Sequence, residues 1–421
     1  MKLKLLILSL FAAVLPAAAQ YYVGGDISVL KSYDDNNVAY YDKQGRRIDD
    51  VLKYMKSEAV GWNAMRVRLF VNPTKQSPDG SRDAQVCQTL DYVKALGKRI
   101  KDEGLAFMLD FHYSDTWADP ANQWTPEAWQ SLSEASLPSK VYEYTKDCLE
   151  QLVAAGATPD FIQTGNEISY GMLWGAYNKK TYFCNTSSDA NWSRFIALLT
   201  QASKACREVC PKAQIIIHTE RAGNANTTRA IYNRLASVDY DVIGLSYYPF
   251  WHGSLSTLST TLNSLAASFP SKKVQIVETA YYYQWQPAAG NGFTDYSSTW
   301  PVSEAGQAKF ARDLVAELRK HDNVNGLYWW FPEENGNGPG SAVLTSWVNR
   351  GLWNNSTHKA MAGLYELKAF TEGRLVNGVA AATTTLMPFD GRWYTLQGIQ
   401  LAAAPQRRGL YINSGRKVFV K

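Results

Sequence analysis

The feature that most constrains the fold of this chain is an alternation between two kinds of segment. Eight short stretches rich in apolar, β-branched and aromatic residues recur, and amphipathic stretches separate most of them. One amphipathic stretch, Asp83–Glu103, places Val86, Leu90, Val93 and Ile100 on one side of a helix. The eight predicted strands are Val23–Leu30, Ala64–Val71, Ala106–Tyr113, Phe161–Ile168, Gln214–Glu220, Asp241–Phe250, Lys273–Tyr281 and Gly326–Phe331.

Alternating strands and helices indicate parallel strands that crossover helices connect, and eight such units predict an α/β fold of the (β/α)8 TIM barrel type. A doubly wound open sheet is the rival. Its usual mark is a glycine-rich phosphate loop after the first strand. Gly24-Gly25 lies within or before that strand and does not form a G-x-G-x-x-G motif, so the sequence favours the closed barrel.

Polar residues gather at the carboxyl ends of the predicted strands, whereas the strand interiors are apolar. In a barrel these ends meet at one mouth, where the active sites of such enzymes lie. The recurrence over several strands therefore predicts a site at the mouth. The residues concerned are Arg66, Arg68, Asp110, His112, Asn166, Glu167, Ser246, Tyr247, Tyr248, Glu278, Trp329 and Trp330.

Two of these residues are glutamates, Glu167 at the end of the fourth predicted strand and Glu278 at the end of the seventh. Cleavage of a glycosidic bond needs one carboxylic acid to protonate the leaving oxygen and one carboxylate to attack C1 or to activate water. A strand-end glutamate can also merely pair with a nearby arginine, but two of them favour catalysis. Glu333 and Glu334, just past the eighth strand, form a rival pair that we interpret as loop residues because an Asn-Gly-rich sequence follows them.

Six stretches of the sequence resemble the endo-β-1,4-galactanases of glycoside hydrolase family 53, which belong to a clan of retaining (β/α)8 hydrolases. The resemblance covers about residues 22 to 370, and its most specific part is the eleven-residue stretch Asp110–Pro120. The other matching stretches are Gly24–Ser28, Asn63–Arg68, Gln163–Ile168, Gly244–Trp251 and Val277–Tyr281.

The resemblance implies a role for each candidate residue. Glu167 matches the acid/base, Glu278 matches the nucleophile, and Asn166 matches the residue that hydrogen-bonds the sugar 2-hydroxyl. Arg66 fits the arginine that keeps the nucleophile ionised, with Arg68 as the alternative. The remaining residues expected to bind substrate are His112, Tyr248, Trp330, Asp115 and Trp117.

No cofactor is expected to be required. Bacterial members of the family can bind Ca²⁺ through an Asp-x-Asn-x-His-like run, and the corresponding stretch here is Asn354-Asn355-Ser356-Thr357-His358. Asn354 replaces the Asp of that run and Ser356 replaces its Asn, so the run loses its negatively charged ligand. Ca²⁺ prefers carboxylate oxygens. We therefore expect no metal among the site residues, although the resemblance makes Ca²⁺ possible.

The N-terminus predicts export. Lys2 and Lys4 precede the apolar run Leu5–Leu15, and an Ala-x-Ala sequence ends at Ala19, so residues 1–19 are expected to be a signal peptide. The run is too short to cross a bilayer, which needs about 20 apolar residues. We expect a secreted protein, in the periplasm, on the cell surface or in the medium, with no integral membrane segment in the mature chain.

The C-terminal part changes in composition after Val376. We expect a catalytic domain over residues 20–375, a small-residue linker over 376–390, and a small all-β appendage over 391–421. That appendage resembles the sorting domains of the type IX export route, in Tyr394–Gly398, Gly409–Ile412 and Lys417–Lys421. A sugar-binding or spacer module is the alternative.

Charge and cysteine content narrow the class further. Residues 391–421 carry six basic and no acidic residues, so the other 390 residues sum to −1 although the whole chain is +5. A nearly neutral body argues against nucleic-acid binding. Five cysteines leave at least one thiol free, so the chain is not a disulfide scaffold.

Taken with the resemblance, these features predict a secreted, monomeric enzyme that hydrolyses β-1,4-galactan, the side chain of pectin, by retaining double displacement. Two alternatives stay open. One is an enzyme of the same clan that acts on mannan, xylan or β-glucan. The other is a surface glycan-binding protein without activity.

Overall fold

The computed structural model describes residues 20–73, 80, 83–185, 189, 191–340, 349–373, 393–395, 400–401, 403–406, 408–413 and 416–420. The chain divides into two compact units, Ala19–Glu372 and a second unit that includes Gly373–Lys421. The expected signal peptide (1–19) and linker (376–390) lie outside the described residues.

The larger unit is a closed barrel of eight parallel strands, which confirms the predicted (β/α)8 fold. Around the barrel the strands follow chain order, and β10 closes it by pairing with β1, with Tyr22 opposite Gly326 and Asp26 opposite Trp330. The strands are β1 (Tyr22–Asp26), β4 (Ala64–Leu69), β5 (Ala106–Phe111), β6 (Phe161–Thr164), β7 (Gln214–Thr219), β8 (Val242–Ser246), β9 (Lys273–Thr279) and β10 (Val324–Trp330).

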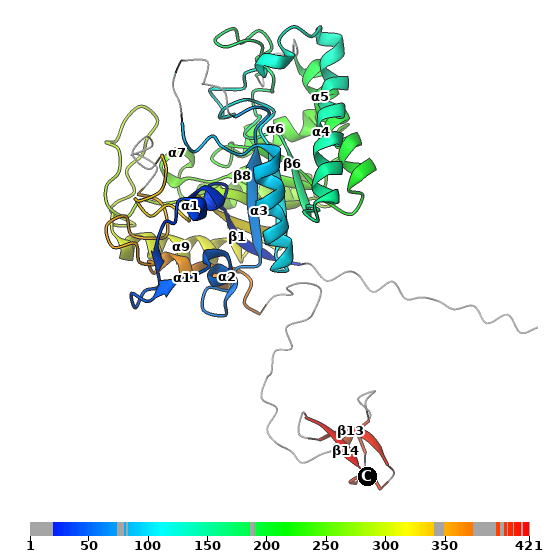
Figure 1. Ribbon diagram of the computed structural model, residues 1–421, viewed down its shortest axis with the longest axis vertical. Coiled ribbons are helices and arrows are strands. Elements are labelled where there is room, and N and C mark those ends of the chain that lie inside the picture. The colour runs from blue at the N-terminus through cyan, green and yellow to red at the C-terminus, as the bar shows by residue number, and fades with distance from the viewer. Residues whose placement is uncertain are drawn as a thin grey trace, which may run out of the picture. The chain divides into compact units, whose positions relative to one another are not determined.

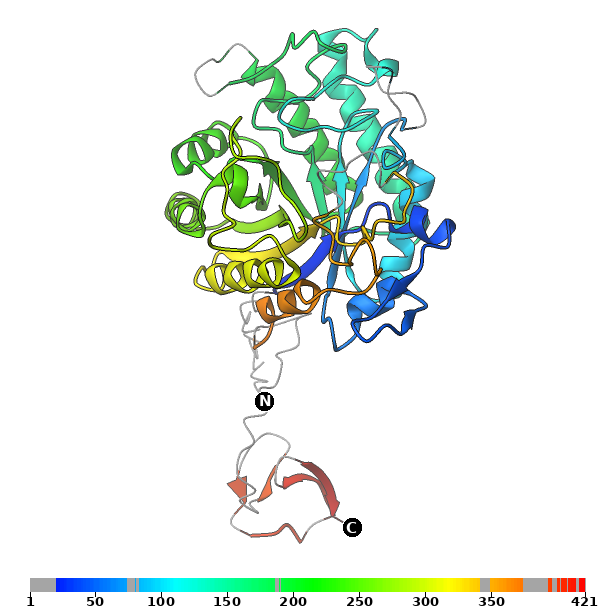
Figure 2. The same ribbon diagram turned by 90° about the vertical axis from the view of Figure 1, so that its left-hand side faces the viewer.

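Helices surround the strands, as Figure 2 shows, and α4 and α5 run side by side in both views (Figure 1). The longer helices are α3 (Leu90–Asp102), α4 (Leu137–Ala154), α5 (Trp192–Val209), α6 (Ala225–Arg234), α8 (Leu255–Ser268) and α9 (Glu304–Leu318). Shorter elements are α1 (Leu30–Asp35), α2 (Val51–Lys56), α7 (Pro249–His252), α11 (Gly363–Glu366), the 3₁₀ turns η1 (Glu127–Trp129), η2 (Glu134–Ser136) and η3 (Leu367–Phe370), and the hairpin of β2 (Tyr40–Tyr41) and β3 (Arg47–Ile48).

Capping side chains set several helix starts. The predicted helix from Asp83 begins at Leu90 instead, because the Thr89 hydroxyl accepts a hydrogen bond from the Tyr92 N–H and ends the irregular segment before it. Ser303 caps α9 in the same way through the Gly306 N–H. Among the described residues, no helix combines the length and the apolar character needed to cross a membrane.

A small apolar cluster fills the lower part of the barrel interior. Its members come from seven strands, so side chains from all around the barrel meet there as in packed TIM barrels. On β4, β5, β6 and β7, the side chain two residues further along the strand points to the same inner face. The cluster comprises Ala64, Met108, Phe161, Ile216, Val242, Val277 and Tyr328.

The C-terminal unit contains a four-stranded antiparallel sheet with the order β12-β11-β13-β14. Its strands are β11 (Trp393–Tyr394), β12 (Gln400–Leu401), β13 (Gly409–Asn413) and β14 (Arg416–Val420). β13 and β14 pair from Gly409 opposite Val420 to Asn413 opposite Arg416. The described residues of this unit thus agree with the predicted small β appendage.

Candidate active site

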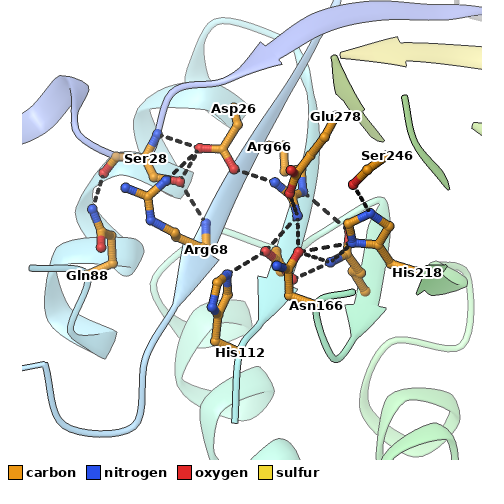
Figure 3. Close-up of polar contacts among 12 residues, drawn as sticks. Asp26, Ser28, Arg66, Arg68, Gln88, His112, Asn166, His218, Ser246 and Glu278 are labelled. Atoms are coloured by element: carbon orange, nitrogen blue, oxygen red, sulfur yellow. Dashed lines mark hydrogen bonds and ion pairs between the residues drawn. The ribbon is translucent and has the colours of Figure 1, made fainter. Parts of the chain in front are cut away.

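A buried polar cluster lies directly above the apolar cluster of the barrel interior, at the carboxyl ends of the strands. Two residues after Ala64, Met108, Phe161 and Ile216 come Arg66, Asp110, Gln163 and His218, each at most 1% exposed. Because strand residues two apart share a face, these side chains all point into the mouth of the barrel. Figure 3 shows Arg66 among its partners there.

Arg66 is the centre of this cluster. Its guanidinium donates to Asp26 Oδ2 at 2.6 Å, to Asp110 Oδ2 at 2.8 Å and to Asn166 Oδ1 at 2.8 Å. Its Nη2 lies 3.0 Å from Glu278 Oε1. A buried guanidinium needs such partners to offset its loss of hydration, and here they fix its plane between four strands.

Glu278 lies in β9, and both of its carboxylate oxygens have partners. Arg66 contacts Oε1, and the Tyr248 hydroxyl donates to Oε2 at 3.0 Å. Burial raises the pKa of Glu278 to about 7, against the opposing effect of Arg66. Arg66 thus lowers the pKa of this carboxyl group, but desolvation outweighs that effect and brings its ionisation close to neutral pH.

Arg68, the alternative partner, does not contact Glu278 in this way. Its guanidinium lies 3.3 Å from Asp26 Oδ1 and stacks over the Trp117 ring, 4.4 Å from the centroid. The two arginines share Asp26, which also accepts a hydrogen bond from the Ser28 hydroxyl. Asp26 thus holds both arginines in place from the first strand.

Glu167 sits in a strained turn after β6. Gly165 has a φ of +100° and Glu167 a φ of +50°, which is uncommon for a residue with a side chain. This turn ends β6 at Thr164, four residues before the predicted end. It presents the carboxyl group to Ser246, whose hydroxyl donates to Glu167 Oε1 at 2.6 Å.

His218 supports this arrangement from β7. Its Nδ1 accepts a hydrogen bond from the Glu167 backbone N–H at 3.3 Å, and it also lies 3.1 Å from the Gln163 amide nitrogen and 3.0 Å from Asn166 Oδ1. The ring proton then lies on Nε2 and is donated to the Ser246 oxygen at 2.8 Å. Burial and the charge of Arg66 hold the pKa of His218 well below its usual range, which keeps the ring neutral.

The two glutamates differ in their electrostatic surroundings. Burial, the negative charge of Glu278 and that of Glu220 raise the pKa of Glu167 well above its usual range. Arg66 lies beside Glu278 and opposes the rise in its pKa, whereas the charged groups that shift the pKa of Glu167 most are other carboxyl groups. Glu278 therefore loses its proton first, and Glu167 keeps its own.

Glu220 is a third carboxyl group at the mouth, at the end of β7 and 7% exposed. Its Oε1 accepts a hydrogen bond from Ser169 and lies 2.9 Å from Arg221 Nε. Burial raises the pKa of Glu220, and Arg221 and Ser169 oppose that effect. It shares the inward direction of His218, two residues earlier.

Asn166 and His112 lie beside the cluster in defined orientations. The Asn166 carbonyl oxygen faces Arg66, and its amide donates to the Ala118 carbonyl at 2.8 Å, which uses one of two amide N–H groups. His112 Nε2 lies 3.1 Å from Asp110, and its Nδ1 accepts from the Ala118 N–H at 3.1 Å.

The other predicted binding residues are placed less uniformly. Tyr248 contacts the nucleophile candidate directly, and Trp330 lies at the end of β10 with its ring 6.3 Å from that of Trp117. The Trp117 indole donates to Asp83 Oδ2 at 2.9 Å. Asp115 Oδ2 accepts from the Glu127 N–H at 2.9 Å, so the contact described for it anchors η1 in the loop after β5.

Glu333 and Glu334 are loop residues after β10, in agreement with the interpretation from sequence, but both are fully buried. Glu333 Oε1 accepts from the Val29 N–H at 3.0 Å, and Glu334 accepts from the Tyr33 hydroxyl. They connect the last loop of the barrel to α1 at the other end of the chain.

The run from Asn354 to His358 does not offer the donor set that Ca²⁺ prefers. The Asn354 side-chain oxygen accepts from the N–H groups of Ser356 and Thr357 at 2.9 Å each, and His358 Nδ1 lies 2.9 Å from the Asn335 carbonyl. Within the part of the chain that the structure describes, no group of three or more His, Cys, Asp or Glu residues could hold a metal ion.

Four residues of the cluster were not given a role from the sequence: Asp26, Gln163, His218 and Ser246. Gln163 and His218 lie inside predicted strands. A polar residue at an inward position of an otherwise apolar strand could have indicated that they belong to the site. Asp26 and Ser246 lie in the stretches that resemble the family. The sequence does not show that Asp26 would contact the two arginines, or that Ser246 would contact Glu167.

Comparisons with known proteins identify the family of this chain. The family described as glycosyl hydrolase family 53 matches residues 22–376. An endo-β-1,4-galactanase of Bacillus subtilis (strain 168) is 30% identical over 379 residues, 87% of this chain and 82% of that protein. An arabinogalactan endo-β-1,4-galactanase of Thermothelomyces thermophilus is 32% identical over 326 residues, 74% of this chain and 89% of that protein.

Solved structures show the same relationship. The catalytic domain of a family 53 protein of Ignisphaera aggregans matches with a TM-score of 0.70 at 29% identity, over 85% of this chain and 97% of that one. A fungal β-1,4-galactanase matches with a TM-score of 0.69 at 28% identity, over 84% of this chain and all of that one. The chain belongs to glycosyl hydrolase family 53, and it is a glycoside hydrolase.

Proposed function

We propose that this glycoside hydrolase is a secreted endo-β-1,4-galactanase that cleaves β-1,4-galactan with retention of configuration. The observation that carries the proposal is the unequal pair of carboxyl groups at the mouth. Glu278 is held by Arg66 and Tyr248, whereas Glu167 is bound by a neutral hydroxyl and has its pKa raised. The substrate is proposed because the named relatives act on galactan.

In the proposed first step, Glu278 attacks C1 of the galactosyl unit and forms a glycosyl–enzyme ester. The bond from C1 to the glycosidic oxygen breaks, and Glu167 transfers its proton to that oxygen. The Ser246 hydroxyl occupies Glu167 Oε1, which leaves Oε2 to carry the proton. Arg66 orients the attacking carboxylate, and Asn166 directs its second amide N–H to the sugar 2-hydroxyl.

In the second step, Glu167 removes a proton from water, which attacks C1 and releases Glu278. Once Glu278 is esterified its negative charge is gone, so the pKa of Glu167 falls and the carboxylate becomes available as a base. No step needs a metal ion or cofactor.

Proton NMR of an early digest tests the mechanism. Double displacement yields the β-anomer first, with the α-anomer appearing only by mutarotation. An initial α-anomer would mean inversion and would remove the nucleophile role of Glu278. The carboxyl groups of retaining enzymes lie about 5 to 5.5 Å apart, against about 6.5 to 9.5 Å in inverting ones.

Incubation with galactan, mannan, xylan and β-glucan, followed by measurement of reducing ends, tests the substrate. Cleavage of galactan alone supports the proposal. Preference for another polymer would assign the protein to a different activity of the same barrel clan, and binding without cleavage would indicate a surface glycan-binding protein.

We also propose that residues 1–19 direct export and are removed, that the C-terminal β unit acts as a type IX-like sorting domain, and that the enzyme is a monomer. Fractionation of cells that make the full chain, with N-terminal sequencing of the mature protein and light scattering, tests the three points separately.

A further inference from the structure

We propose that His218 determines which carboxyl oxygen of Glu167 carries the catalytic proton, and that it does so through the Ser246 hydroxyl. The proposal rests on the proposed function, in which Glu167 is the general acid, and it adds a residue that orients this acid. His218 lies in β7, and Ser246 ends β8, the next strand of the barrel. His218 acts on the carboxyl group through Ser246, so it is a positioning residue and not a catalytic one.

The first observation is that His218 holds Glu167 both by its backbone and by its carboxyl group. His218 Nδ1 accepts a hydrogen bond from the Glu167 backbone N–H at 3.3 Å, and the His218 carbonyl accepts from the Ile168 N–H at 3.0 Å. On the other side of the ring, Nε2 lies 2.8 Å from the Ser246 oxygen (Figure 3). The Ser246 hydroxyl in turn donates to Glu167 Oε1 at 2.6 Å.

The second observation is the direction of these hydrogen bonds. A neutral imidazole has one N–H group and one acceptor nitrogen. Since Nδ1 accepts from Glu167, the ring proton lies on Nε2 and points at the Ser246 oxygen. The serine proton is then directed to Glu167 Oε1, and the donors run in one direction, from His218 through Ser246 to Glu167.

The third observation is that this direction is enforced by burial. Among the residues that the structure describes, the side-chain hydrogen bonds of Ser246 are those with His218 and Glu167. Both His218 and Ser246 are 0% exposed. If Ser246 accepted a proton from His218 and from Glu167 together, its own hydroxyl would be a buried donor without an acceptor, which is unfavourable.

The position of the catalytic proton follows from this direction. Because Glu167 Oε1 accepts from Ser246, the proton of the acid lies on Oε2. Without the N–H group of His218, the Ser246 hydroxyl could turn and accept a proton from Oε1. That proton would then be bound to the serine and not directed at the leaving oxygen, and the acid would have to reorient before each transfer.

A spectroscopic measurement on the full chain tests the direction. Nitrogen-15 NMR of the protein labelled at its five histidines distinguishes a protonated ring nitrogen from a bare one, and the spectrum of His218→Asn identifies the His218 signals. We expect a protonated Nε2 and a bare Nδ1 at neutral pH. A proton on Nδ1, which lies 3.0 Å from Asn166 Oδ1, would make Nε2 an acceptor and would overturn the proposal, as would a ring that is protonated at both nitrogens.

Kinetics of four single-site variants test the consequence for catalysis. Ser246→Ala and His218→Asn remove the donation to Glu167 or to Ser246, whereas His218→Gln keeps an amide N–H near the position of Nε2. His321→Asn is the matched control, because His321 Nε2 also lies 3.0 Å from a serine hydroxyl, that of Ser259 in α8, outside the barrel. The measurements are kcat/KM on galactan and on an aryl β-galactoside with an acidic leaving group, with thermal unfolding of each variant.

We expect Ser246→Ala and His218→Asn to lower kcat/KM for galactan by roughly 10- to 100-fold, less than the complete loss of a general acid, and to spare the aryl galactoside. In Ser246→Ala the basic limb of the pH profile should move to higher pH, because the Ser246 hydrogen bond lowers the pKa of Glu167. His218→Gln should recover most of the galactan activity, and His321→Asn should match wild type.

Equal losses on the two substrates, or an unchanged galactan rate in both Ser246→Ala and His218→Asn, would overturn the proposal. If His218→Asn does not fold, replacement of the other four histidines in turn assigns the His218 signals, and the wild-type spectrum decides. A wild-type protein that does not cleave galactan would instead overturn the proposed function.

Discussion

The surroundings of Glu167 raise its pKa and so favour the protonated form that a general acid needs. It is held at a positive φ, touched by a neutral hydroxyl, and surrounded by two other carboxyl groups. Strain of this kind is stable only when neighbouring contacts impose it, and here Ser246 and His218 supply those contacts.

Replacement of this residue tests its role as the acid. We expect Glu167→Ala to slow galactan cleavage by roughly 100- to 10,000-fold, the range for loss of a general acid. An aryl galactoside with an acidic leaving group needs no proton, so its first step should be spared. Equal losses on both substrates, measured as kcat/KM, would show that Glu167 is not the acid.

Glu220 provides a second test at this scale, through the pH profile. Its negative charge is one cause of the raised pKa of Glu167, so Glu220→Gln should lower that pKa. Activity requires protonated Glu167, and the basic limb of kcat/KM should move to lower pH. The acid limb, where activity falls as Glu278 takes up a proton with a pKa of about 7, should change less.

A control for this profile is Glu208→Gln on α5, whose side chain is 39% exposed and pairs with Lys146. It should reproduce the wild-type profile. If the basic limb of Glu220→Gln also coincides with wild type, Glu220 does not act on the acid through its charge.

Sequence reasoning identified both catalytic candidates because each is a glutamate near the carboxyl end of a barrel strand, where active sites lie. Strand alternation does not orient them, because Glu167 lies in a positive-φ turn and Glu278 follows the inward-facing Val277 at an irregularity in the pairing of β8 and β9. Sequence reasoning could not identify the relay from His218 through Ser246, which depends on contacts between strands 28 residues apart in sequence. Arg66 and Arg68 have the same parity, so only the three-dimensional position of Asp26 and Glu278 distinguishes them.

Among the elements, β1 carries an unusual packing constraint. A Cβ atom added at Gly24 would lie 1.6 Å from the Ala64 carbonyl oxygen of the neighbouring strand β4. Both strands are fixed in the closed barrel, so neither can move aside. This close contact explains Gly24, and a Cβ at the adjacent Gly25 would lie 2.6 Å from Pro332 Cγ, so both glycines considered for a phosphate loop are explained by packing.

We therefore expect Gly24→Ala to cost on the order of 4 kcal/mol or more of folding free energy and to abolish soluble expression or lower the melting temperature sharply. Gly104→Ala is the matched control. Gly104 has a φ of +69° with nothing within 4 Å of an added Cβ, so only the backbone cost of about 1 to 2 kcal/mol applies. Similar melting curves for the two variants would show that β1 can shift.

At this scale the sequence predicted all eight strands and their order, because apolar periodicity is a local property. It placed strand ends too late where a turn depends on backbone conformation, as at Gly165 after β6. It also began the helix near Asp83 too early, since the Thr89 cap competes with a good amphipathic pattern.

For the whole molecule, the two compact units suggest that catalysis resides in the barrel and localisation in the C-terminal part. Truncation after Glu372 removes Gly373–Lys421, the C-terminal part of the second unit, and leaves the whole barrel. We expect the truncated enzyme to hydrolyse soluble galactan at nearly the wild-type rate while accumulating in a different cell fraction. Rates on purified protein and fractionation by immunoblot measure the two effects, and an inactive or unfolded truncate would show that the tail belongs to the catalytic unit.

The pairing of β10 with β1 also has a consequence for synthesis. Asp26 and Trp330, which are opposite each other in the barrel, lie 304 positions apart, so a ribosome working at about 5 to 20 residues per second separates them by roughly 15 to 60 s. Until the last strand emerges, β1 has an unpaired edge and the barrel around Glu278 is not closed. A half-made chain is therefore catalytically silent, and its activity begins only when the two ends of the barrel meet.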